Sequence, residues 1–120
     1  MRFSEAVHRR FFAPEHRLDA LRPGAIPGRA ETPDACVALW LWLERDRVRE
    51  AAFRVWGCPV TVAAADYVCE RVRDRTQAAA RGLTIAEMEQ ALSSPPARRS
   101  ALLVVNDALM AALDFQTVEA

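Results

Sequence analysis

The sequence predicts a single α+β domain, in which helices cover one face of a small antiparallel three-stranded sheet. Three observations lead to this prediction. The chain has 120 residues, which gives room for one domain with one core over residues 1–120. Two neighbouring segments alternate in apolar residues like the arms of a hairpin, and the segments after them repeat their apolar residues at helical spacing.

The elements are expected in the order helix, meander, helices. A short amphipathic helix is expected over 3–12, and the proline-containing connection 18–35 is expected to hold one edge strand near Ile26 to Thr32. Strands over 37–43 and 48–56 form the hairpin. Three helices follow, over about 60–75, 84–92 and 98–115, the second opened by a capping-box pattern.

Composition and charge exclude several classes of partner. Apolar residues make up 52% of the chain, and sixteen acidic residues balance sixteen basic ones, so we expect neither nucleic acid nor a membrane as a partner. The segment 1–12 lacks the apolar run of a signal peptide, which favours a cytoplasmic protein. Cys36, Cys58 and Cys69 are then reduced thiols, and their number and spacing do not fit a disulfide framework or a zinc knuckle.

Several motifs resemble those of one known family. The segment 51–65, AAFRVWGCPVTVAAA, is similar to the strand, Gly-Cys turn and small-residue helix of the U-type iron–sulfur cluster assembly scaffolds, the IscU and NifU N-terminal type. Ile85-Ala86-Glu87, Pro95-Pro96 and Asn106-Asp107-Ala108-Leu109 recur in the family's order and approximate spacing. The resemblance spans nearly the whole chain and implies the same sheet-and-helix fold.

The resemblance also implies where metal ligands would lie. Three cysteines, aided by an aspartate and a histidine, hold zinc, iron or a nascent cluster in that family, and thiolates are the ligands that such sites select. Cys58 matches the second cysteine. An ungapped alignment places Asp34 at the first cysteine and Cys36 at the aspartate, whereas a two-residue deletion makes Cys36 the first cysteine.

The third ligand position is where the sequence departs from the family. The family's His-Cys pair falls on Ser100-Ala101, and neither side chain replaces a thiolate. The predicted metal-binding residues are therefore Asp34, Cys36 and Cys58, one thiolate fewer than the family provides. Cys69, about 16 Å further along the same helix, is expected to be a half-buried packing residue.

Two functions follow from this partial match. The first is a scaffold-like, non-enzymatic protein of iron–sulfur cluster assembly, which binds an iron–sulfur cluster, iron or zinc weakly, or receives sulfur on Cys58 from a cysteine desulfurase or works with another cluster-biogenesis protein. The second is an interaction protein that has kept the fold, has lost the cluster and works without a cofactor. No catalytic motif points to an enzyme, and His8 and His16 are expected in surface or helix-packing roles.

The first hairpin strand is apolar on both faces. Its leucines and tryptophans alternate, and the family pattern places Trp40 and Trp42 toward the helices and Leu39, Leu41 and Leu43 outward. An outward leucine stripe predicts a partner or a homo-oligomer through this face. The alternative is that the long connection before the strand, or the C-terminal tail, folds over the stripe.

Overall fold

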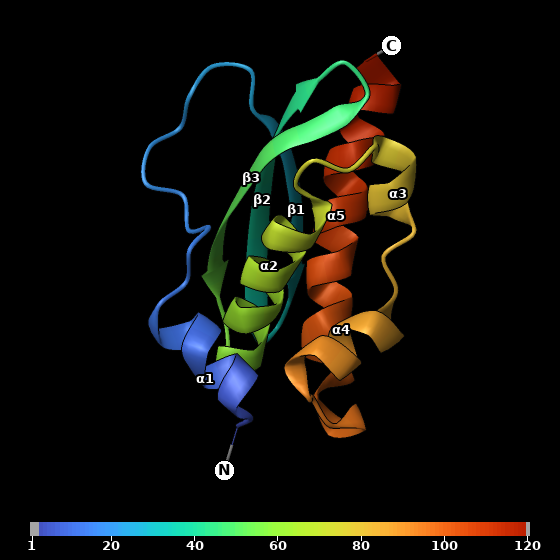
Figure 1. The fold of residues 1–120 in the computed structure, drawn as a ribbon. Coiled ribbons are helices and arrows are strands. Elements are labelled where there is room, and N and C mark those ends of the chain that lie inside the picture. Colours follow the sequence, from blue (N-terminus) through green and yellow to red (C-terminus); the bar gives the residue numbers. More distant parts are fainter. Residues whose placement is uncertain (1–2, 120) are drawn as a thin grey trace.

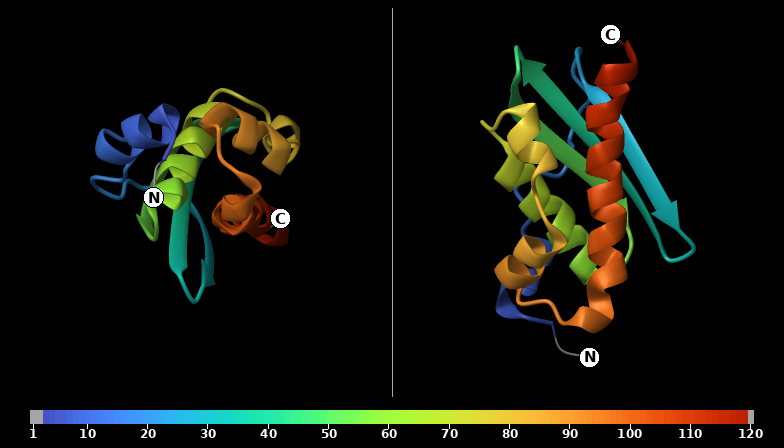
Figure 2. Two further views of the ribbon diagram at one scale, coloured as in Figure 1. Left: turned by 90° about the horizontal axis from the view of Figure 1, so that it is seen from below. Right: turned by 90° about the vertical axis from the view of Figure 1, so that its right-hand side faces the viewer.

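The computed structural model describes residues 3–119 and shows one antiparallel sheet with helices packed on one of its faces (Figure 1). The elements are α1 (Glu5–Phe12), β1 (Ile26–Thr32), β2 (Ala35–Glu44), β3 (Arg47–Trp56), α2 (Pro59–Val72), α3 (Gln77–Arg81), α4 (Ile85–Leu92), the 3-10 turn η1 (Pro96–Arg98) and α5 (Arg99–Glu119). The two further views in Figure 2 show α2 and α5 lying over the sheet. α1 packs against α2 on the side that faces away from α5 (Figure 2). No helix within residues 3–119 combines the length and hydrophobicity needed to span a membrane.

The sheet is a meander with β2 in the centre. β1 and β3 both pair antiparallel with β2, so that Leu39 faces Gly28 on one side and Phe53 on the other. A β-bulge interrupts the β2–β3 register after Trp42. The predicted α+β class, with a three-stranded antiparallel sheet and helices on one face, is confirmed.

The inner face of the sheet carries the leucines of β2, not its tryptophans. Leu39 and Leu41 are each 1% exposed, and Leu43, just past the bulge, packs half-buried against the core. Trp40 and Trp42 are half-buried on the opposite face. The prediction that the three leucines face outward was therefore wrong, and they cannot form the surface of a homo-oligomer.

A close approach of α5 to the sheet explains which face is buried. A Cβ atom at Gly28 of β1 would lie 2.2 Å from the carbonyl oxygen of Ala108 and 2.4 Å from the amide nitrogen of Ala112. The space between α5 and the sheet accommodates the side chains of leucine, valine and alanine but leaves little room for indole rings. Alternation along β2 fixes that leucines and tryptophans lie on opposite faces, but it does not say which set faces the helices.

The connection before β1 covers part of the outer face. The guanidinium carbon of Arg22 lies 4.5 Å from the ring centroid of Trp42, and the Trp42 indole donates a hydrogen bond of 3.4 Å to the Arg22 carbonyl oxygen. At this end of the face, the long connection thus lies against Trp42 and not over the leucine stripe, which the helices cover, so the alternative was wrong about which side chains the connection covers. At the other end, Trp56 is 68% exposed.

Side chains at helix starts tie the helical layer together. The Thr84 hydroxyl accepts a 3.1 Å hydrogen bond from the Glu87 amide, which confirms half of the capping box. The Glu87 carboxylate does not complete the box, because it accepts hydrogen bonds from the Tyr67 hydroxyl at 2.8 Å and the Arg71 guanidinium at 2.6 Å. Glu87 thereby joins α4 to α2.

A buried carboxylate holds the connection after α1 in place. Asp66, on α2, is 1% exposed, and one of its oxygens accepts the backbone amides of Glu15 and His16 at 2.9 and 3.0 Å. Its other oxygen pairs with Arg10 at 2.9 Å. Further along, the amide of Leu18 donates to the carbonyl oxygen of Phe53 at 2.9 Å, so the connection also follows the edge of β3.

Candidate functional site

A cavity of about 270 Å³ lies at the junction of β3 and α2, next to Cys58. Cys58 is the N-cap of α2, and Pro59 occupies the first position of the helix. The remaining walls come from the β1–β2 turn, from η1 and from the start of α5. The lining residues are Thr32, Asp34, Ala35, Cys58, Thr61, Ala97, Arg98, Ser100, Ala101 and Val104.

The environment of Cys58 favours its thiolate form. Burial alone would raise the pKa of the thiol, but the Thr61 hydroxyl 3.4 Å from the sulfur, the neighbouring amides of Thr61 and Val60, and the charge of Arg98 together lower the pKa below its ordinary value. The position at a helix N-terminus acts in the same direction. Because Cys58 is half-buried and lines the cavity, its sulfur is accessible to a ligand or reagent of modest size.

Two of the three predicted ligand residues share the cavity. Asp34 lines it, in the turn between β1 and β2, together with Cys58. Cys36 does not: Ala35 and Val37 beside it are buried on the helix side, so Cys36 projects half-buried from the outer face of the sheet. Of the two candidates for the first ligand position, only Asp34 lines the cavity, and which of them corresponds to the family's first cysteine stays a prediction.

The third ligand position is occupied by residues that cannot supply a thiolate. Ser100 and Ala101 both line the cavity from the start of α5, as the motif spacing implied. Within residues 3–119, no three His, Cys, Asp or Glu side chains have ligand atoms within 4.8 Å of one another at this cavity. One thiolate and one carboxylate remain, fewer than the three protein ligands of ordinary metal sites. The ligand roles of Asp34, Cys36 and Cys58 stay predictions.

The remaining candidates lie elsewhere in the molecule. Cys69 is 1% exposed in the core, more deeply buried than expected, and burial raises the pKa of its thiol well above the ordinary value. His8 is exposed on α1, and His16 is half-buried beside β3. Two residues that line the cavity, Thr61 and Arg98, were not predicted from the sequence. Thr61 could have been found from its position three residues after the N-cap Cys58. At the start of a helix, the side chain of the N-cap residue and that of the third residue after it lie close together.

The family model described as "NifU-like N terminal domain" matches residues 3–118. The chain belongs to this family. The family prediction is thereby confirmed, and it agrees with the strand, Gly-Cys turn and helix that form the cavity. No curated protein matches the chain in sequence.

Solved structures show the same fold at low sequence identity. A nitrogen-fixing NifU-like protein (N-terminal) from Brucella abortus has a TM-score of 0.78 and 15% identity, over 98% of this chain and 95% of that one. A protein assigned as an iron–sulfur cluster assembly scaffold for the SUF system, from the thermophile Fervidobacterium islandicum AW-1, has a TM-score of 0.76 and 15% identity, over 92% and 96%. A hypothetical protein has a TM-score of 0.72 and 17% identity, over 91% and 94%.

Proposed function

We propose that the protein is a scaffold-type, non-enzymatic component of iron–sulfur cluster assembly that handles sulfur, and metal only weakly, at Cys58. Family membership over residues 3–118 supports the assembly role. The observation that carries the specific proposal is that, of the three cysteines, only Cys58 lines the cavity, with its pKa lowered by the start of α2.

The donor set of the cavity does not fit a complete cluster. Iron–sulfur clusters are commonly held by four cysteine thiolates, whereas the described lining offers one thiolate and the carboxylate of Asp34. We therefore treat a cluster, iron or zinc as cargo that requires further ligands from a partner. Sulfur handling therefore ranks ahead of metal binding by the isolated chain.

A single thiolate suffices to accept a sulfur atom. The Cys58 thiolate would attack the outer sulfur of a persulfide on a donor protein; a new S–S bond forms to Cys58, the donor's S–S bond breaks, and the electron pair leaves on the donor thiolate. The persulfide proton moves with the transferred sulfur, so no oxidant or reductant is consumed. A cysteine desulfurase is the kind of donor that carries such a persulfide.

Sulfur transfer can be tested by mass spectrometry of the intact chain after incubation with a cysteine desulfurase and cysteine. We expect one added sulfur atom in the wild type and in Cys36→Ser, and none in Cys58→Ser. Thr61→Val removes the hydroxyl beside the sulfur and should slow transfer at neutral pH by raising the pKa of the thiol. Labelling that persists in Cys58→Ser would contradict the proposal.

A second candidate function is a non-catalytic interaction protein that has lost cluster binding. Ser100 and Ala101 in place of the third ligand favour it. So do two exposed apolar side chains next to the cavity segments, Trp56 at 68% and Leu103 at 46% exposure.

Anaerobic reconstitution with iron and sulfide, followed by metal analysis, separates the two functions when Cys58→Ala is run beside the wild type. Metal or sulfide bound by the wild type and lost in Cys58→Ala supports the scaffold. If the wild type binds neither and also gains no sulfur from the desulfurase, the interaction protein is the remaining function.

A further inference from the structure

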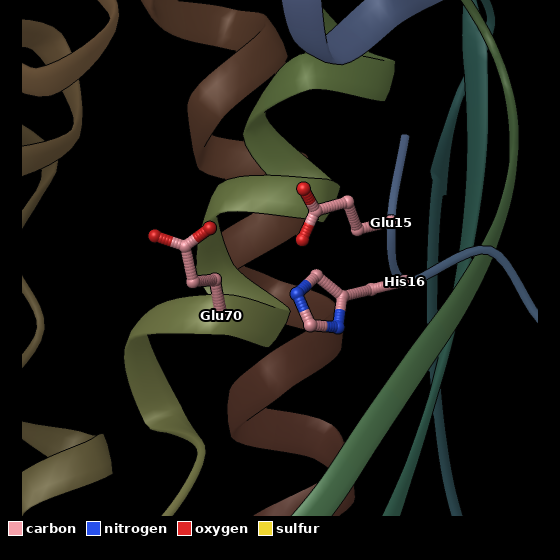
Figure 3. A group of neighbouring side chains, drawn as sticks. All are labelled: Glu15, His16 and Glu70. Atoms are coloured by element: carbon pink, nitrogen blue, oxygen red, sulfur yellow. The ribbon is translucent and has the colours of Figure 1, made fainter. Parts of the chain in front are cut away.

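A second group of ligand-type side chains lies away from Cys58, where the connection after α1 crosses α2. Glu15 and His16 belong to the connection, and Glu70 belongs to α2. One ligand atom from each of the three side chains lies within 4.8 Å of the others, and within the described residues this is the only group of three or more His, Cys, Asp or Glu side chains that meets this distance. Figure 3 shows the carboxylate of Glu15 and the ring of His16 pointing toward Glu70.

The backbone that carries this group is fixed independently of any ligand. The amides of Glu15 and His16 both donate to the buried carboxylate of Asp66, and the carbonyl oxygen of His16 accepts the Phe53 amide at 3.0 Å. Asp66 and Glu70 lie one helical turn apart on α2, so they face the connection from the same side. The backbone positions of all three residues are therefore set by the fold.

Two of the three side chains have ligand atoms that are not engaged elsewhere. In the part of the chain that the structure describes, neither the Glu15 carboxylate nor the His16 ring makes a hydrogen bond or an ion pair. An open cavity of about 240 Å³, lined by Glu15 and Glu70 together with Arg9 and Arg10, gives solvent ions access to the two carboxylates. One imidazole and two carboxylates supply three protein ligands, the number found in sites that leave a fourth position to water.

We propose that Glu15, His16 and Glu70 form a binding site for a divalent transition-metal ion of the Zn²⁺ or Fe²⁺ kind. The ion takes one imidazole nitrogen and one oxygen from each carboxylate. The site joins the connection to α2 and is separate from Cys58, because Glu70 lies twelve residues beyond the N-cap of α2, about 18 Å along the helix axis. It stands on its own geometry and does not depend on the function proposed for Cys58.

The charge of Arg10 affects which ions can bind at the site. Its guanidinium group contacts both oxygens of Glu70 at 3.2 and 3.3 Å. A carboxylate has about four lone-pair positions, so Glu70 can bind an ion and keep this contact. The positive charge of Arg10 nevertheless opposes any cation held by charge alone. Ions that gain strong bonding from imidazole, such as Zn²⁺, should bind, and Mg²⁺ or Ca²⁺ should not.

Calorimetric titration of the full-length chain with Zn²⁺ tests the proposal, in a Cys36→Ser/Cys58→Ser background that removes the two accessible thiols. We expect one Zn²⁺ per chain. His16→Gln and Glu15→Gln should each weaken binding at least about tenfold, a loss typical of changes around a metal site. His8→Gln is the matched control, because it removes the exposed imidazole of α1 and should leave binding unchanged.

A second readout excludes misfolding as the cause of a loss. The melting temperature of the background chain should rise with Zn²⁺ concentration and return on addition of EDTA, whereas Glu15→Gln should melt like the metal-free background and show little rise. The proposal is overturned if His16→Gln and Glu15→Gln bind Zn²⁺ as the background does, if His8→Gln weakens binding equally, if Mg²⁺ binds as well as Zn²⁺, or if no stoichiometric binding is measured.

Discussion

Replacing Gly28 by alanine tests the contact between β1 and α5. The new methyl carbon would lie 2.2 Å from the Ala108 carbonyl oxygen, 2.4 Å from the Ala112 amide nitrogen and 2.6 Å from the Ala112 Cβ atom. Two of these atoms belong to the backbone of α5 and cannot rotate away. To reach a van der Waals separation of 3.4 Å, the helix and the strand must move apart by about 1 Å.

The expected cost is about 3 kcal/mol, the upper part of the range for overpacked cores, because the displacement affects the longest helix and not one side chain. For a domain of this size, that loss lowers the melting temperature by on the order of 10 °C. Thermal and urea unfolding followed by circular dichroism measure both quantities.

Gly82→Ala is the matched control for this substitution. Gly82 has an ordinary backbone conformation, and the nearest atom to an added Cβ is the Ala79 carbonyl oxygen at 3.4 Å. Its free energy of unfolding should change by less than about 1 kcal/mol, in either direction. If Gly28→Ala unfolds at the same temperature as Gly82→Ala and the wild type, α5 does not lie against β1 as described.

Two further predictions concern carboxylates of the helical layer. Asp66→Asn weakens the buried contact with Arg10, at 2.9 Å, and should lower the free energy of unfolding by about 3 kcal/mol in urea titrations; a loss below about 1 kcal/mol would contradict the anchoring role of Asp66. The pKa of Glu87 lies below its ordinary value: burial would raise it, but hydrogen bonds from Tyr67 and Arg71 prevail. Its stabilising contribution, about 1 kcal/mol for a partly exposed group, is therefore present at neutral pH and disappears as pH falls through its folded pKa. The difference in unfolding free energy between wild type and Glu87→Gln should shrink as pH falls through the folded pKa of Glu87, and a difference independent of pH would refute this reasoning.

Elements with a repeated pattern could be predicted from the sequence. The hairpin, the edge strand at Ile26–Thr32 and the three longer helices after Gly57 were expected close to where they lie. α3 was missed, because five residues do not complete a second turn of amphipathic pattern. Its signal is the N-cap Thr76, whose hydroxyl accepts the Ala79 amide at 3.1 Å.

The candidate site could be predicted only in part, because a sequence motif marks the position of Cys58 but no motif marks the residues on the opposite wall of the cavity. Cys58 is fixed by the strand, Gly-Cys-Pro turn and helix, which are contiguous in sequence. The choice between Asp34 and Cys36 depends on whether the alignment with the family contains a two-residue gap, and a single sequence does not decide this. That Asp34, and not Cys36, lines the cavity follows from the place where the β1–β2 turn ends and β2 begins, at Ala35.

The anchoring of the connection could not be predicted, since its partners are distant in sequence. Asp66 is separated from Glu15 and His16 by 51 and 50 residues, and no local pattern marks an aspartate that will be buried against backbone amides. The same separation hides the Glu15, His16 and Glu70 group. Only the packing of the connection over α2 brings them together.

The sheet separates the two accessible thiols. Cys36 projects from its outer face, whereas Cys58 lines the cavity on the helix side, so the two thiols open onto different sides of the sheet. Oxidation is therefore expected to link these cysteines between molecules rather than within one chain. Any sulfur atom taken up by Cys58 has no resolving thiol inside the same chain and must leave to an acceptor that arrives from solution.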